Sequence, residues 1–176
     1  MWIRDNLPNH LKSVRAVVYG HDTKLHDSQS FQSIQDLAHK LIDQLLAYGW
    51  KNSSAKPIAF LAHSLGGLIL KEALIQLDKS QDQAYKSLLN RIRGAIFFGV
   101  PNLGMEQAHF QTVVRNNPNE ALVDDIGRNS NYLRRLNEAF TGASFETSLK
   151  CFWAFETSES PTLSVCGSHS LPIKYF

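Results

Sequence analysis

Residues 57–77 read Pro57-Ile-Ala-Phe-Leu-Ala-His-Ser-Leu-Gly-Gly-Leu-Ile-Leu-Lys-Glu-Ala-Leu-Ile-Gln-Leu77. The first five residues form an apolar run typical of a buried strand, and Pro57 stands at its first position, where no ladder donor is lost. From Leu68 the run combines an apolar face with good helix formers, so we expect a helix over 68–77. The residues in between are mostly small. This stretch therefore predicts a strand, a sharp turn and a helix in direct succession.

Ser64 lies at the centre of the predicted turn. Ala62 and Gly66 occupy the two small positions of a G-x-S-x-G elbow, and Gly67 gives extra room at the start of the helix. A serine on such a turn stands clear of the backbone and can attack a carbonyl carbon, with the Leu65 amide as one donor to the oxyanion. The alternative is a serine that only caps the helix. The glycine patterns of a dinucleotide-binding or P-loop protein are missing, which favours the nucleophile.

The remaining chain alternates further apolar runs with helical patterns. Apolar runs predict strands over 14–19, 57–61, 94–99 and 151–155, and helical spacing predicts helices over 31–46, 68–77, 85–92 and, less regularly, within 105–142. Strands that are apolar throughout indicate a parallel sheet covered by helices on both faces. Functional groups of such sheets gather at the carboxyl ends of the strands, where Ser64, Asn102 and Glu156 fall. For Asn102 we expect a positioning role, because an amide cannot hold an imidazolium as a carboxylate does.

Composition bounds the class of protein. The chain has 176 residues, enough for one domain over 1–176, with 43% hydrophobic and 19% charged residues, as in ordinary soluble proteins. A formal net charge of +2 is too small to favour nucleic acid as a partner. No apolar run is long enough for a transmembrane segment, and the N-terminus lacks a secretory signal. Cys151 and Cys166 are expected to be ordinary thiols, so we predict an intracellular, cytoplasmic protein without metal or cofactor.

Several longer runs carry a family resemblance. Residues 58–74 and Gly94-Ala-Ile-Phe-Phe-Gly-Val-Pro-Asn-Leu-Gly104 resemble lipase-like α/β-hydrolases of the "serine active site containing protein" type. Residues 2–8 and 19–22 also match the fungal members, which are often fused to NACHT or ankyrin-repeat regions, and residues 156–162 fit the same group. The resemblance covers residues 1–162. It implies an α/β-hydrolase core with a mostly parallel sheet flanked by helices, lacking the N-terminal strands, in a chain clipped at both ends.

The resemblance also implies a catalytic set. Ser64 corresponds to the nucleophile. In the family the acid comes just after the strand that follows the one over 94–99, which selects Glu156, with Glu159 as second choice. The base should be a histidine after one further strand, a position that His169 occupies. The order Ser, Glu, His along the chain agrees with the hydrolase pattern. His63, next to the nucleophile, is expected to pack or hydrogen-bond beside the elbow rather than serve as the base.

Two functions stay open at this point. The first is a serine esterase that hydrolyses a small-molecule or lipid ester through an acyl-enzyme on Ser64. The alternative is a non-catalytic, truncated hydrolase-like module of a signalling or lipid-handling protein. Its motivation is that the family begins with a further strand and a His-Gly loop that donates the second oxyanion N–H, and we expect this chain to start after that point. By resemblance alone, the protein would associate with mitochondrial or endoplasmic-reticulum membranes and belong to a larger fusion or bind a partner protein.

Overall fold

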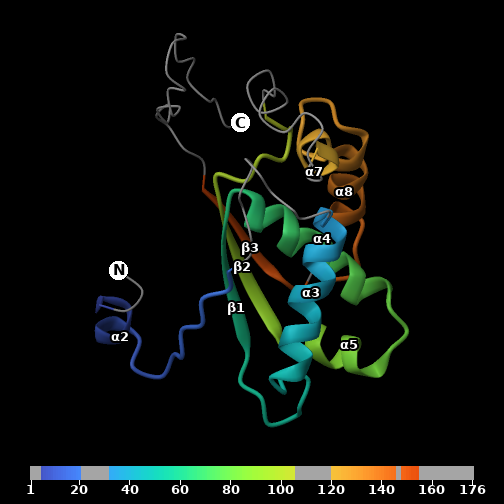
Figure 1. Ribbon diagram of the computed structural model, residues 1–176. Helices are drawn as coiled ribbons and strands as arrows, with labels where there is room; N and C mark the ends of the chain where they lie inside the picture. Colours follow the sequence, from blue (N-terminus) through green and yellow to red (C-terminus); the bar gives the residue numbers. More distant parts are fainter. Residues whose placement is uncertain (1–4, 21–31, 106–119, 146–147, 155–176) are drawn as a thin grey trace.

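A three-stranded parallel sheet forms the centre of the computed structural model, which describes residues 5–20, 32–105, 120–145 and 148–154 (Figure 1). The strands lie in the order β1 (Ile58–His63), β2 (Ile92–Phe98), β3 (Lys150–Ala154). Each crossover carries helices: α4 (Leu65–Lys79) and α5 (Gln83–Leu89) join β1 to β2, and α7 (Glu120–Asp125) and α8 (Asn131–Thr141) lie between β2 and β3. The predicted α/β class with a mostly parallel sheet is confirmed.

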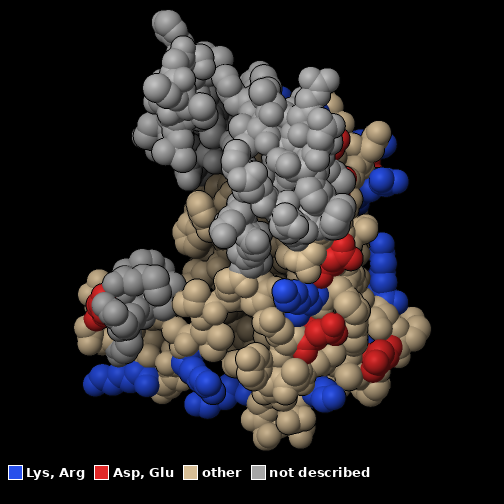
Figure 2. All heavy atoms as spheres, viewed as in Figure 1, with Lys and Arg blue, Asp and Glu red and all other residues tan. Residues whose placement is uncertain are grey.

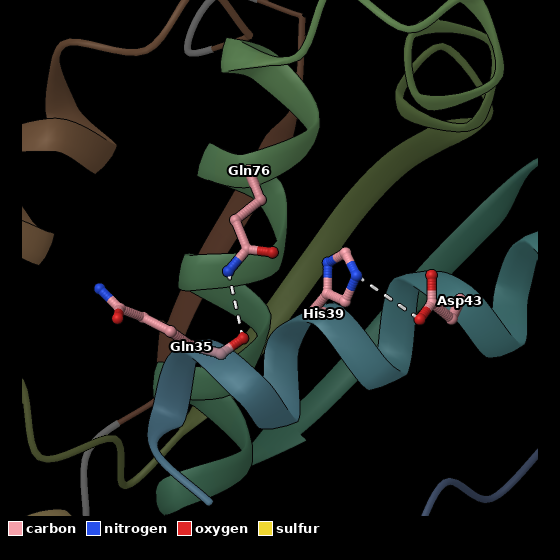
Figure 3. A network of polar contacts seen from close by, with 4 residues as sticks. All are labelled: Gln35, His39, Asp43 and Gln76. Atoms are coloured by element: carbon pink, nitrogen blue, oxygen red, sulfur yellow. Dashed lines mark hydrogen bonds and ion pairs between the residues drawn. The ribbon is translucent and has the colours of Figure 1, made fainter.

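Helix α3 (Ile34–Ala47) precedes β1 and packs along α4. A capping box starts it: the Asp36 amide donates to the Ser33 hydroxyl, and the Asp36 carboxylate accepts from the Ser33 amide. In Figure 3, Gln76 of α4 donates from Nε2 to the backbone oxygen of Gln35 at 3.2 Å. These contacts tie α3 to the helix that follows Ser64.

Helix α4 is the centre of the core. Its side chains Leu68, Leu74 and Leu77 are at most 1% exposed, between the sheet on one side and α3 and α8 on the other. On the same face of the sheet, the Phe97 ring of β2 stacks on the Trp153 ring of β3 with centroids 4.3 Å apart, and Phe140 of α8 meets Phe97 edge-on. Alternate strand residues thus place large apolar side chains on the face of the sheet that the helices cover.

The opposite face of the sheet differs from our expectation of helices on both sides. The strand register places Leu61, Ile96 and Phe152 in one row across this face, and Leu61 and Phe152 are 48% and 62% exposed. Among the residues that the structure describes, the helices packed on the sheet lie on one side only (Figure 1).

The run over 14–19 does not form the strand we predicted. Val14, Val17 and Val18 are more than half exposed, and no ladder joins them to the sheet. A β-branched run becomes a strand only when a neighbouring edge satisfies its backbone groups. The short helix α2 (Leu7–His10) precedes this run.

Other differences are shifts of boundaries. Helix α4 begins at Leu65, three residues before the predicted start, so the glycines of the turn belong to its first turn. Within the irregular segment 105–142, helices α7 and α8 are found. The described part of the chain holds no helix that is long and apolar enough to cross a membrane. Acidic and basic side chains are interspersed over the helical side in Figure 2.

Candidate active site

Ser64 has the backbone conformation of a nucleophile elbow. It lies between the last residue of β1 and the first of α4, at φ 51° and ψ −127°, which is the mirror image of the first central position of a type II turn and favours glycine. Its amide donates to the Phe98 oxygen at 2.9 Å, and its carbonyl accepts from the Gly67 amide at 2.9 Å. The Ser64 side chain makes no capping hydrogen bond. The alternative of a serine that only caps α4 is therefore wrong.

The two glycines of the elbow have different surroundings. A Cβ atom built on Gly67 would lie 2.2 Å from Cγ2 of Val100, whereas one on Gly66 would meet no described atom within 4 Å. Ala62, the first small position, is 8% exposed. We assigned the second small position to Gly66 and only extra room to Gly67. Among the described residues, Gly67 is the position without room for a side chain, because the loop after β2 packs on the third residue of α4.

Ser64 lies at the carboxyl edge of the sheet, together with the ends of the other two strands. The last register row joins His63, Phe98 and Ala154, and the Gly99 amide donates to the Ala154 oxygen at 3.0 Å. Strands lie about 4.8 Å apart, so β3 ends about 10 Å from the elbow. Glu156 follows Ala154 by two residues. Glu156, its alternative Glu159 and His169 lie outside the described residues.

Helix α4 supplies the electrostatics expected of an oxyanion site. The first backbone N–H groups of a helix have no partner within the helix, and Leu65 is the first residue of this 15-residue helix. The helix dipole adds a partial positive charge at the same end, directly beside Ser64. The Leu65 amide is thus placed at the end where a developing negative charge would be stabilised. His63 lies on the exposed face of the sheet.

The described residues hold no cluster of His, Cys, Asp and Glu side chains suited to a metal ion.

One charged side chain is buried near the elbow. Lys71 of α4 is 3% exposed, and this burial lowers the pKa of its ammonium group to about 8. Our predictions from sequence did not include Lys71. Helical spacing from Leu68 and Leu74, at three residues on either side, places Lys71 on the buried face and could have revealed it.

The sequence around this site matches a known protein family. Residues 2–117 match the family described as "Putative serine esterase (DUF676)". The chain belongs to this family. The matched segment contains the whole elbow and the loop after β2, which are the parts of the site that the structure describes. Glu156 and His169 lie beyond it.

Curated relatives match most of the length of this chain. Protein SERAC1 of Mus musculus is 25% identical over 179 residues, covering 98% of this chain and 27% of the relative. Protein SERAC1 of Danio rerio is 29% identical over 161 residues, covering 89% of this chain and 24% of the relative. The chain thus spans about a quarter of the length of these relatives.

Among solved structures, the phospholipase PlaB from Legionella pneumophila has the same fold. It superposes with a TM-score of 0.57 and 16% sequence identity, covering 77% of this chain and 28% of PlaB. This likeness supports the α/β-hydrolase core and says nothing further about chemistry. The finer resemblance to fungal proteins with NACHT or ankyrin-repeat regions stays a prediction.

Proposed function

We propose that this chain hydrolyses carboxylic esters through an acyl-enzyme formed on Ser64. The observation that carries the proposal is the backbone of Ser64, held at φ 51° at the N-terminus of α4 while its side chain makes no capping bond. A serine in this position presents its hydroxyl at a helix N-terminus, and the family match agrees with ester chemistry.

In this mechanism the Ser64 oxygen attacks the ester carbonyl while His169 accepts its proton, and Glu156 orients the imidazole. The Leu65 amide donates to the oxyanion of the tetrahedral intermediate. His169 then protonates the leaving alcohol, and water hydrolyses the acyl-enzyme by the same steps in reverse order. Glu159 is the alternative to Glu156.

We further propose a lipid or other apolar ester as substrate. Leu103, on the loop whose Val100 contacts Gly67, is 68% exposed and offers an apolar side chain on this loop. Association with mitochondrial or endoplasmic-reticulum membranes and membership of a larger fusion or complex are proposals of the same kind. They rest on the family resemblance and on relatives about four times as long.

A fluorophosphonate probe tests the nucleophile directly. We expect the folded protein to be labelled on Ser64, no labelling of Ser64→Ala, and unchanged labelling of Ser54→Ala, a control in the exposed loop before β1. An unlabelled wild-type protein would reject the esterase and favour the non-catalytic alternative.

The partners of Ser64 are tested by turnover of p-nitrophenyl esters. Glu156→Gln and His169→Gln should each reduce kcat by at least about 10³-fold, because triad members act as a unit. Glu159→Gln is the matched control. If Glu159→Gln is impaired and Glu156→Gln is not, the acid is Glu159. A kcat/KM that rises from acetate to octanoate would support an apolar acyl site, and a fall would contradict it.

A further inference from the structure

Lys71 joins three parts of the fold. Its Nζ donates to Oδ1 of Asn102 at 2.9 Å, on the loop after β2, and to Oδ1 of Asn137 on α8. Asn137 in turn donates from Nδ2 to the backbone oxygen of Asn102 at 2.8 Å. The buried ammonium group is therefore a junction between α4, α8 and the loop.

The partners of Lys71 are neutral. Besides the two amide oxygens, its Nζ lies 5.1 Å from the ring centre of Phe140 and 5.6 Å from that of Trp153. No carboxylate of the described residues forms an ion pair with it. Amide oxygens and aromatic faces attract a cation through dipoles and quadrupoles, so both kinds of contact are strongest while Lys71 is protonated.

The end of β2 and the loop that Lys71 holds each touch the elbow once. The oxygen of Phe98, the last residue of β2, accepts from the Ser64 amide at 2.9 Å, and Val100 of the loop fills the space above Gly67. Asn102 is tied to the second of these contacts, because its amide donates to the Val100 oxygen at 2.8 Å. A shift of Asn102 is thus transmitted through Val100 to the first turn of α4.

We propose that the protonated side chain of Lys71 positions the loop 99–104 against the elbow and thereby sets the reactivity of Ser64. Lys71 acts through Asn102 and Val100, so it is a positioning residue. The inference rests on the proposed function, since it deepens the account of the same site.

Few ionisable groups face Lys71. Among the described residues, the one that interacts with it electrostatically is Cys151 of β3, whose thiol has a pKa raised by burial. No charged group of α8 or of the described loop is found to act on it. Burial is the dominant influence and places its loss of charge near pH 8. The positioning should weaken as the pH rises past this value.

The first experiment measures the loop without relying on activity. Amide hydrogen exchange of Asn102 and Gly104, whose N–H groups donate to Val100 and Pro101 within the loop, is followed by NMR in wild-type protein and Lys71→Met. Loss of the charge-assisted bond should speed this exchange about tenfold or more. Lys79→Met, an exposed lysine in the last turn of the same helix, is the matched control and should exchange like the wild type.

The second experiment follows the rate of fluorophosphonate labelling of Ser64 between about pH 6 and pH 10. We expect the wild-type rate to fall with a midpoint near pH 8, and Lys71→Met to label about tenfold more slowly at neutral pH without this alkaline fall. Asn102→Asp places a carboxylate beside Lys71 and should move the midpoint upward by about one pH unit or more. This variant carries the test if Lys71→Met does not fold.

The outcomes separate the two proposals. Exchange and labelling in Lys71→Met that equal those of the wild type would overturn the positioning role, as would an unmoved midpoint in Asn102→Asp. If the wild type is not labelled at all, the esterase proposal fails. In that case faster exchange in Lys71→Met would still support the hold on the loop, and unchanged exchange would overturn it.

Discussion

Substitution of Gly67 by alanine tests the packing of the elbow against the loop after β2. The added Cβ would lie 2.2 Å from Cγ2, 2.9 Å from Cγ1 and 3.1 Å from Cβ of Val100. Carbon atoms need about 3.5 Å, so Val100 or α4 must move by more than 1 Å. Val100 is 4% exposed, and its carbonyl is held by the Asn102 amide. Overpacking of this kind costs about 1–3 kcal/mol.

Gly66→Ala is the matched control, because it adds the same methyl group one residue earlier in the same helical turn, where no described atom lies within 4 Å. The gain in helix propensity is similar at both positions and cancels in the comparison. The free energy of unfolding of Gly67→Ala, measured by urea denaturation, should therefore be about 1–3 kcal/mol below that of Gly66→Ala.

A double-mutant cycle identifies the clash itself. Val100→Ala removes both Cγ atoms, so Gly67→Ala should cost about 1–3 kcal/mol less in the Val100→Ala background than in the wild type. Equal stability of the two glycine variants, or additive effects of Gly67→Ala and Val100→Ala, would refute the assignment of Gly67 as the position that must stay small.

Three further predictions concern other residues of the α4 region. Burial lowers the pKa of Lys71 from 10.5 to about 8, so between pH 8 and pH 10.5 the unfolded chain binds more protons than the folded one. As the pH rises through this range, the free energy of unfolding of the wild type should increase relative to that of Lys71→Met by about 3 kcal/mol. A difference in urea midpoints that does not change with pH would contradict it. Ser64→Gly should be about 1 kcal/mol more stable than Ser64→Ala in thermal unfolding, because glycine relieves the strain at φ 51°; equal Tm values would argue against this strain. The free energy of unfolding of Tyr132→Phe, measured by urea denaturation, should be about 1–2 kcal/mol below that of the wild type, because the hydrogen bond from the Tyr132 hydroxyl to Glu72 at 3.0 Å is lost. Burial and the Glu72 carboxylate raise the pKa of Tyr132, so its phenolate absorbance should appear only after that of exposed tyrosines.

Local patterns were sufficient for the elements that build the site. The three strands of the sheet and the helix after Ser64 were all predicted, because the apolar run or helical spacing that identifies each element lies within its own residues. The run over 14–19 has the same local character as β1 and still does not pair with the sheet. Pairing depends on an available edge elsewhere in the chain, and local sequence does not encode it.

The sequence by itself determined the strand–turn–helix around Ser64, because small residues at a bend and good helix formers after it act over neighbouring positions. Only the tertiary structure decided that Gly67 must be small, since Val100, 33 residues away, fills that space. It likewise decided that Lys71 is buried among neutral partners from the loop and α8. Both facts arise from contacts between segments that are far apart along the chain, and these exist only once β1, β2 and β3 lie side by side.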